Sequence, residues 1–190
     1  ALAAFVKERF GVEFTLDPDI VTGFASDSSN LPGSAQALCR PANERECAVA
    51  LRICRQAGIP ITLSGGRTNL TGSATPPGGM VLSTAKMLTP EPVVDSGTQT
   101  LVAPVAIPLE DLRDIVLHQT GRRLVFPVDP TSRKEAWLGG ALACNASGFT
   151  PGETGAIRAW VEGVRFLLPS GLLVEARRGD LISDRGLFTL

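Results

Sequence analysis

The most informative segment of the sequence is Ser64-Gly65-Gly66-Arg67-Thr68-Asn69-Leu70-Thr71-Gly72, which directly follows the apolar run of residues 59–63. Two adjacent glycines after a short β-branched strand allow backbone conformations that are closed to other residues, so several N–H groups can point at one anion. Ser64, Thr68, Asn69 and Thr71 would add side-chain donors. The segment therefore predicts a cradle for a phosphate group.

Neither of the two common phosphate-binding motifs accounts for this segment. No Gly-Lys-Ser/Thr follows it, as a P-loop requires, and no G-x-G-x-x-G opens a helix, as in a Rossmann unit. Glycine, serine, threonine and asparagine also dominate ordinary loops for conformational reasons, so a loop without a ligand is the competing interpretation.

Further blocks stand before and after the glycine-rich segment in a definite order. They are Phe24-Ala25-Ser26-Asp27-Ser28-Ser29, Phe126-Pro127-Val128-Asp129-Pro130-Thr131-Ser132, Leu138-Gly139-Gly140-Ala141-Leu142-Ala143-Cys144-Asn145-Ala146-Ser147-Gly148, Gly155-Ala156-Ile157-Arg158 and the strand-turn-strand pattern of residues 163–175. The series, from about residue 20 to residue 176, resembles the FAD-binding domain of the vanillyl-alcohol oxidase and p-cresol methylhydroxylase (PCMH) superfamily. Within it, the series is most similar to the branch of glycolate oxidase subunits and D-lactate dehydrogenases.

The resemblance implies a set of contacts with FAD. The backbone of Ser64, Gly65, Gly66, Arg67, Thr68 and Asn69 would bind the pyrophosphate. Pro127, Asp129, Pro130, Thr131 and Ser132 would lie along the ribityl and flavin side. Gly139, Gly140, Ala143, Asn145 and Gly148 would let the backbone approach the cofactor, and Val164 would contact its adenine end.

Some residues depart from the family pattern. Ser64 replaces a usual arginine, Arg67 and Asn69 stand at usual glycines of the loop, and Ser147 replaces a glycine of the later block. If position 67 tolerates a side chain, its guanidinium suits a phosphate; if the position needs a positive φ, strain of about 1–3 kcal/mol weakens binding. No histidine lies in or near the loop, where some relatives tether the flavin, so non-covalent FAD is expected.

Composition excludes several other classes of function. The 190 residues carry a net charge of −1 without a basic stripe, which argues against a nucleic-acid partner. The apolar runs are too short for a membrane span, and the amino terminus lacks a basic region followed by an apolar core, so a soluble, cytoplasmic domain is expected. Cys39, Cys47, Cys54 and Cys144 show no metal-ligand spacing, which indicates reduced, mostly buried thiols and no metal site.

The pattern of elements favours an α+β fold of one domain, residues 1–190, with two lobes. Helical spacing over residues 43–57 before a strand at 59–63 predicts a strand-helix-strand unit in a small first lobe, about residues 20–85. A further strand at 80–83 would close this first lobe. Strands at 93–96 and 100–105, a helix at 109–119, a short helix or turn at 136–143, and a hairpin of 164–168 with 172–176 predict a second lobe, about residues 86–190, with a mainly antiparallel sheet and flanking helices. The resemblance implies the same PCMH-type arrangement, with FAD stretched between the lobes.

By this resemblance the chain is the FAD-binding domain of a flavin-dependent oxidoreductase. Its parent would oxidise a D-2-hydroxy acid of the lactate or glycolate type by hydride transfer to FAD and pass electrons to a separate acceptor. The substrate-binding cap domain, with the catalytic residues, would lie outside this chain. The alternatives are a non-catalytic FAD-binding or electron-relay subunit of a complex, and an α+β domain without a cofactor.

Overall fold

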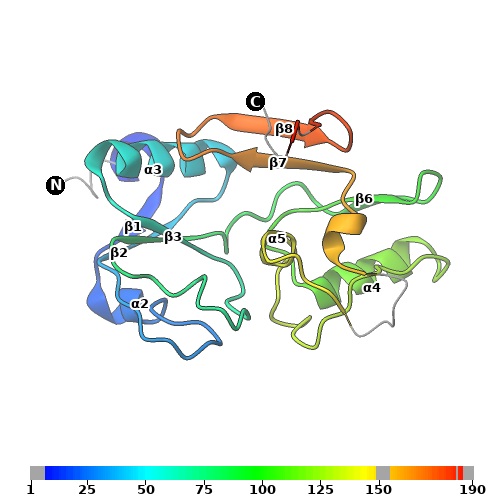
Figure 1. Cartoon of the computed structure of the whole chain (residues 1–190), viewed down its shortest axis with the longest axis horizontal. Coiled ribbons are helices and arrows are strands. Elements are labelled where there is room, and N and C mark those ends of the chain that lie inside the picture. The colour runs from blue at the N-terminus through cyan, green and yellow to red at the C-terminus, as the bar shows by residue number, and fades with distance from the viewer. Residues whose placement is uncertain (1–6, 149–154, 183, 186–190) are drawn as a thin grey trace.

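The first part of the molecule is built on a four-stranded sheet (Figure 1). The computed structural model describes residues 7–148, 155–182, 184 and 185. The strands are β1 (Glu13–Thr15), β2 (Ala37–Arg40), β3 (Ile61–Ser64) and β4 (Met80–Ser83), in the order β1-β2-β4-β3. β4 pairs in parallel with both β2 and β3, and β1 is antiparallel to β2. The predicted strand-helix-strand unit is present, but β4 lies between its two strands.

The helix of that unit, α3 (Glu44–Ala57), begins and ends where local signals place it. The Asn43 side chain accepts a hydrogen bond from the Glu46 N–H, and the Glu46 carboxylate accepts one from the Asn43 side chain, so the helix opens on a reciprocal cap. Gly58, with φ 64°, ends it in the left-handed conformation. β3 begins two residues later than predicted, because the N–H of Ile59 still bonds the carbonyl of Cys54 and Pro60 has no N–H to give a sheet.

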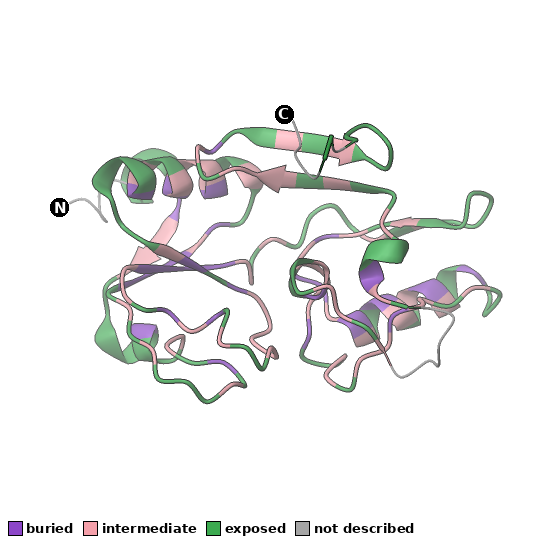
Figure 2. Ribbon diagram, viewed as in Figure 1, coloured by how far each residue is buried: buried purple, intermediate pink, exposed green. Residues whose placement is uncertain are grey.

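Apolar side chains cover both faces of this sheet (Figure 2). On one face α3 packs Cys47, Ala50 and Cys54 against strand residues that include Met80 and Leu82. On the other, Leu38 and Val81 pack against Val21 of α2 (Pro18–Thr22) and against Phe24. Covering both faces buries the parallel strands, as parallel sheets require.

The second part is organised around helices. It contains β5 (Val93–Asp95), β6 (Thr100–Val102), α4 (Leu109–Gln119), α5 (Leu138–Ala143) and the 3₁₀-helix η1 (Ile157–Ala159). Its core joins Leu109 of α4, Ala141 of α5 and Ile157 of η1 with Val128 and Ala136 from the segment between the two α-helices. Pro108 precedes α4, whose bounds equal the predicted 109–119.

After β4, the antiparallel pairs of the described residues form two separate two-stranded sheets, β5-β6 and β7-β8, instead of one larger sheet. β7 (Gly163–Leu167) and β8 (Leu173–Arg177) make the predicted hairpin, which crosses back over α3 of the first part (Figure 1). Arg52 of α3 donates hydrogen bonds to the carbonyl oxygens of Ser170 and Gly171, and Arg165 pairs with Glu44 at 2.8 Å. A boundary between lobes at about residue 85 stays a prediction, since the hairpin contacts the first part.

The α+β class is confirmed by this mixture of a parallel sheet, antiparallel hairpins and helices. None of the helices in the described ranges is both long and apolar enough to cross a membrane.

Candidate functional site

The glycine-rich loop leaves the carboxyl end of β3 and presents a row of free amides. No hydrogen bond joins the backbone N–H groups of residues 65–69 to another described residue, and all five residues are half-buried. Buried backbone donors normally have partners, so a row of unpartnered amides at a strand end is typical of a site that a ligand completes. Since these free groups are hydrogen-bond donors, the ligand that suits them is an anion.

Two serines lie beneath this loop on paired positions of β3 and β4. Ser64 is fully buried, and its Oγ has no hydrogen-bond partner. Ser83, its neighbour in the parallel register, is 1% exposed, and its Oγ accepts a 3.4 Å hydrogen bond from the Ala85 N–H. An unpartnered buried hydroxyl is uncommon in native proteins. Besides the loop amides, the Ser64 hydroxyl is thus a second hydrogen-bonding group at this place that has no partner.

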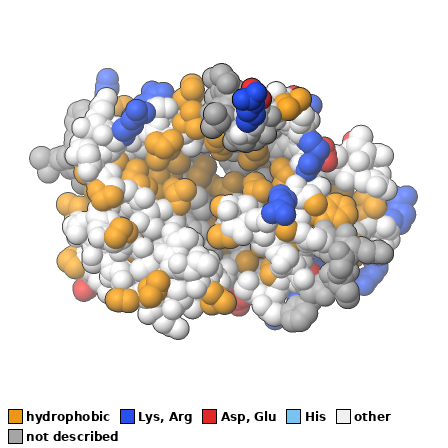
Figure 3. Space-filling model, in the orientation of Figure 1, with side chains coloured by type: hydrophobic (Ala, Val, Ile, Leu, Met, Phe, Trp, Pro, Cys, Tyr) orange, Lys and Arg blue, Asp and Glu red, His pale blue; other side chains and the backbone are white. Residues whose placement is uncertain are grey.

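A hollow of about 340 Å³ opens beside the loop, which is the lower end of the range for small-molecule sites. It is lined by Phe24, Gly65, Gly66, Arg67, Ser83, Ala85, Glu135 and Trp137. Hydrophobic side chains gather around the hollowed centre of the face in Figure 3, beneath the β7-β8 hairpin. The hollow therefore lies where the first part of the chain meets the second.

Gly66 is a point of very close contact between the two parts. A Cβ built on it would lie 1.9 Å from the carbonyl oxygen of Glu135 and 3.3 Å from the Cα of Ala136. No side chain fits at such distances, so glycine is required here by the close approach of two backbones. The contact puts the glycine-rich loop beside residues 135–137, which directly follow the second predicted block.

The side chains of the loop are used differently from what we expected. Asn69 was predicted to offer a donor to the ligand, but its Nδ2 donates to Asp27 at 2.9 Å and its Oδ1 accepts from the N–H groups of Thr71 and Ser73. The Thr71 hydroxyl also bonds Asn69. These two side chains hold the loop's own shape, so the backbone amides and the Ser64 and Thr68 hydroxyls remain for a ligand.

Asp27 anchors this arrangement from the opposite segment. It is 8% exposed, and its carboxylate accepts hydrogen bonds from the N–H groups of Ser29 and Ala74 and from the Asn69 side chain. Burial alone would raise the pKa of Asp27, but these hydrogen bonds outweigh it and lower the pKa from 3.8 to about 2. The carboxylate is thus charged near neutral pH and ties residues 27–29 to residues 69–74.

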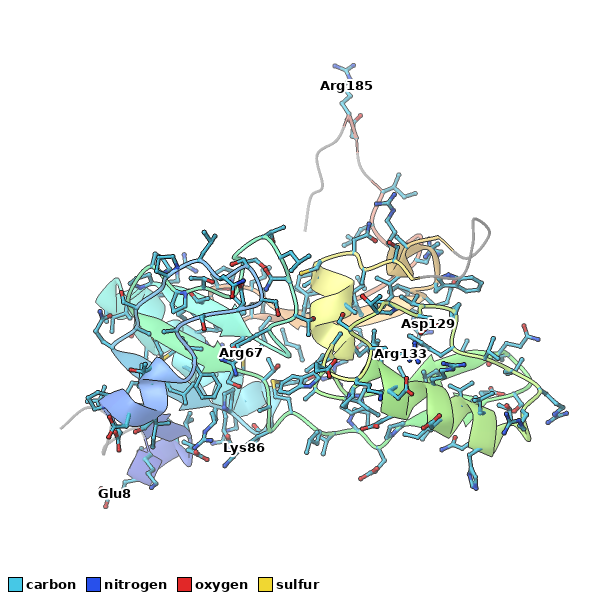
Figure 4. All side chains as sticks on the ribbon, turned by 90° about the horizontal axis from the view of Figure 1, so that it is seen from below. Glu8, Arg67, Lys86, Asp129, Arg133 and Arg185 are labelled. Atoms are coloured by element: carbon cyan, nitrogen blue, oxygen red, sulfur yellow. The ribbon has the colours of Figure 1, made fainter. Side chains whose placement is uncertain are left out.

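Arg67 has a φ of 56°, in the region that favours glycine. Position 67 therefore has the positive φ that was one of the two possibilities, and the backbone strain there is about 1–3 kcal/mol. The guanidinium does not extend freely: its Nη1 donates to the Gly23 and Ser26 carbonyl oxygens, and it lies over the Phe24 ring, 4.9 Å from the centroid. Viewed from below, Arg67 lies toward the middle of the molecule, across from Asp129 and Arg133 (Figure 4).

The second predicted block forms a tight turn fixed to α4. Arg133 pairs with Asp129 at 2.9 Å and with Glu110 of α4, and its N–H bonds the carbonyl of Pro130. The Ser132 carbonyl accepts from Glu135 and Ala136. Pro127, Pro130 and Ser132 are half-buried, and Thr131 is exposed. The Asp129 carboxylate is therefore occupied by Arg133, so what this block offers a ligand is mainly backbone and hydroxyl groups.

The third block consists of α5 and the turn after it. Gly139 packs against Val105, and a Cβ on Gly148 would lie 2.4 Å from the backbone nitrogen of Asp129, so these two glycines serve contacts within the protein. Gly140 is exposed with open space around its Cβ position, and Ala143 is exposed as well. Asn145, with φ 51°, follows the end of α5, and its side chain accepts from the Arg158 N–H at 3.4 Å.

The structure gathers only part of the predicted set around one hollow. Gly65, Gly66 and Arg67 line it, whereas the predicted residues of the second and third blocks belong to the second part and are not among its lining residues, and half-buried Val164 lies in β7. Phe24, Ser83, Ala85, Glu135 and Trp137 were not assigned as site residues. Phe24 and Trp137 had a signal that could have been used, since Phe24 opens a quoted block and Trp137 directly precedes one.

The cysteines and the acidic residues add no further centre to this site. Cys39, Cys47 and Cys54 are free and buried, and Cys144 is free and exposed. Burial raises the pKa of the Cys39 thiol to about 12 and that of Cys47 to about 11, which makes them poor nucleophiles. Within the part of the chain that the structure describes, no three His, Cys, Asp or Glu side chains are placed to hold a metal ion.

Comparison with known sequences identifies relatives. A model of the FAD binding domain family matches residues 35–177. The chain is 30% identical over 150 residues to D-2-hydroxyglutarate dehydrogenase of Xanthomonas citri pv. viticola, covering 79% of this chain and 31% of that protein. It is 31% identical over 137 residues to D-lactate dehydrogenase of Archaeoglobus fulgidus, covering 72% of this chain and 30% of that protein. Glycolate oxidase subunit GlcD of Bacillus subtilis is 30% identical over 149 residues, covering 78% and 31%. The chain spans about a third of the length of these relatives.

Solved structures share the fold. Xylooligosaccharide oxidase from Myceliophthora thermophila superposes with a TM-score of 0.74 at 18% identity, over 94% of this chain and 37% of that one. Alkyldihydroxyacetonephosphate synthase superposes with a TM-score of 0.76 at 21% identity, over 93% and 38%. At such identities the likeness concerns the fold alone.

Proposed function

Because the chain belongs to the FAD binding domain family, within the vanillyl-alcohol oxidase and p-cresol methylhydroxylase superfamily, we propose that it binds FAD non-covalently as the cofactor domain of a flavin-dependent oxidoreductase. The observation that carries the proposal is the row of unpartnered amides at residues 65–69 beside the hollow. Family membership predicts a phosphate-binding loop at this place, and the loop of this chain has the donors that such a loop needs.

The donor set fits a pyrophosphate. The amides of residues 65–69, the unpartnered Ser64 Oγ and the Thr68 hydroxyl are all able to donate to phosphate oxygens. The Arg67 guanidinium adds positive charge at the rim, and Glu135 is the one acidic residue among those that line the hollow. An excess of donors over acceptors favours an anion, and the small size of the hollow favours part of a dinucleotide over the whole molecule.

The remaining predicted contacts keep their roles within the proposal. Residues 127–132 and 139–148 would form the wall along the flavin side, and Val164 would contact the adenine end. Gly140 and Ala143 have the exposure that close backbone approach to a ligand requires, whereas Gly139 and Gly148 would act by keeping that wall compact. Bound FAD would supply the ability to accept a hydride, which no side chain has.

The activity of the longer protein is part of the same proposal. Relatives named as D-lactate dehydrogenase, D-2-hydroxyglutarate dehydrogenase and glycolate oxidase subunit support oxidation of a small D-2-hydroxy acid, with a separate electron acceptor. Residues that bind the substrate would come from outside this chain. A cytoplasmic location is consistent with the free thiols of the described cysteines.

A non-catalytic FAD-binding or electron-relay subunit is the second candidate, and the strained Arg67 favours it. Arg67 stands where the family pattern has glycine, and its φ of 56° carries a strain of about 1–3 kcal/mol that would weaken cofactor binding. Flavin reduction in the longer protein by one member of a panel of 2-hydroxy acids supports the enzyme. Bound flavin that no member reduces supports the module.

Titration of the chain with FAD, with riboflavin as the matched ligand without a pyrophosphate, tests the cofactor proposal. At a hundredfold excess over Kd, FAD should raise the free energy of unfolding by about 2.7 kcal/mol, and riboflavin should raise it much less. Acid precipitation should then release all flavin into the supernatant if the link is non-covalent. A folded chain whose unfolding neither ligand changes would contradict the proposal.

A further inference from the structure

Arg67 is held in its left-handed conformation by one neighbouring segment, residues 23–28. Arginine rarely adopts a positive φ, and such residues persist only where the surroundings hold them. Residues in this state cluster at ligand clamps and switch regions, so the outlier itself points to a function. The contacts that hold Arg67 in this conformation therefore indicate the role of the residue.

Among the described residues, the hydrogen bonds and the ring contact of Arg67 all go to this segment. The Nη1 donates to the carbonyl oxygens of Gly23 and Ser26, and the guanidinium lies over the Phe24 ring at 4.9 Å. The Arg67 carbonyl oxygen accepts hydrogen bonds from the N–H of Ser28 at 3.0 Å and from its hydroxyl at 3.1 Å. Both the side chain and the backbone of Arg67 thus hold residues 23–28 against the glycine-rich loop.

The same segment supplies two groups that shape the site. Phe24 lines the hollow together with Arg67, Gly65 and Gly66. Asp27 holds Asn69 and Ala74, on the far side of the loop. The loop is consequently attached to residues 23–28 at two points, Arg67 and Asn69, which flank Thr68 and directly follow the amides of Gly65 and Gly66.

We infer that Arg67 is a positioning residue for the pyrophosphate of the cofactor: it fixes Phe24 as a wall of the hollow and holds the loop amides in place, acting through the segment 23–28 and not as a direct partner of the phosphates. The inference rests on the proposed function. A guanidinium whose face covers an aromatic ring and whose Nη1 points at carbonyl oxygens is directed toward the protein.

Substitutions at residue 67 separate positioning from direct charge. Arg67→Lys keeps the positive charge and the strained backbone. It lacks the planar guanidinium group that stacks on the Phe24 ring and donates to two carbonyl oxygens. Arg67→Asn loses the charge but tolerates a positive φ. If Arg67 positions the loop, both variants should weaken ADP binding by about tenfold. Arg122→Lys is the matched control, because Arg122 also has a positive φ, 65°, and lies in the turn after α4 away from the hollow.

If Arg67 acts through Phe24, substitutions of these two side chains should have coupled effects on ADP binding. Phe24→Leu should weaken ADP binding to a similar degree, Phe24→Tyr should keep it, and the double variant Phe24→Leu, Arg67→Lys should bind no more weakly than the weaker single variant. Additive losses would overturn the inference. So would an Arg67→Lys variant that binds ADP like the parent chain while Arg67→Asn does not, since that result assigns a direct charge contact.

Hydrogen exchange of the ligand-free chain tests the clamp without any cofactor. Arg67→Lys and Arg67→Asn should speed exchange of the amides in residues 23–30, and Arg122→Lys should not. Unchanged exchange in this segment would overturn the inference even if the chain binds ADP. If the parent chain binds neither ADP nor FAD, the proposed function fails, and faster exchange in the Arg67 variants would still establish Arg67 as the clamp.

Discussion

Replacing Asp27 by asparagine should lower the free energy of unfolding by about 2 kcal/mol at pH 7. Hydrogen bonds from Ser29, Ala74 and Asn69 outweigh burial and lower the pKa of Asp27 from 3.8 to about 2, which corresponds to roughly 2.5 kcal/mol. A second argument agrees. Three donors converge on the two oxygens of Asp27, and an asparagine would turn an NH₂ group toward at least one of them, leaving a buried donor unpaired at a cost of about 1–3 kcal/mol.

The effect should depend on pH in a defined direction. A carboxyl whose folded pKa is depressed contributes stability that is present above its ordinary pKa and is lost as the pH falls through the folded pKa. The parent chain should therefore lose this stability between about pH 4 and pH 2, and the Asp27→Asn variant, which has no group to titrate there, should not. The difference between the two proteins should be largest at pH 7 and shrink below pH 4.

Urea denaturation followed by far-UV circular dichroism at pH 7, 5, 3.5 and 2.5 measures both quantities. Asp114→Asn is the matched control, because Asp114 is exposed in α4 and its side chain makes no hydrogen bond with the described residues. The reasoning would be refuted by a difference of less than about 0.5 kcal/mol at pH 7, which is the range of ordinary surface substitutions. A difference that stays constant down to pH 2.5 would refute it equally, since the carboxylate would then not be the source.

Other expectations concern the glycines and the thiols. Gly66→Ala should cost about 1–3 kcal/mol or more and abolish FAD binding, because its Cβ would overlap the Glu135 carbonyl; unchanged FAD affinity would show that the two backbones separate freely. Gly140→Ala, with open space around its Cβ, should stabilise the ligand-free chain by about 0.5–1 kcal/mol in thermal denaturation, and weaker FAD binding by this variant would support backbone contact there. A disulfide reagent at pH 8 should modify Cys144 rapidly and Cys39, Cys47 and Cys54 only on unfolding, since burial raises the pKa of all three; rapid reaction of a second thiol would contradict the described core.

Much of the secondary structure could be predicted because its signals are local. Asn43 and Gly58 mark the ends of α3 through contacts within a few residues, and Pro108 precedes α4. The order of the motif blocks also predicted the family and its α+β fold, which the family match and the solved relatives confirm. The glycines after β3 also predicted a turn at this strand end, because glycine adopts backbone conformations that other residues rarely do; that the turn binds an anion stays a prediction.

Tertiary packing decided the rest. The insertion of β4 between β2 and β3, the separation of the antiparallel pairs into two hairpins, and the return of the last hairpin onto α3 all depend on which distant segments bury one another. The hollow has the same origin, since Phe24, Gly66 and Glu135 meet only in the folded chain. Local conformational preferences act over a few residues and so could be recognised in the sequence, whereas these contacts join segments dozens of residues apart and arise from packing of the whole chain.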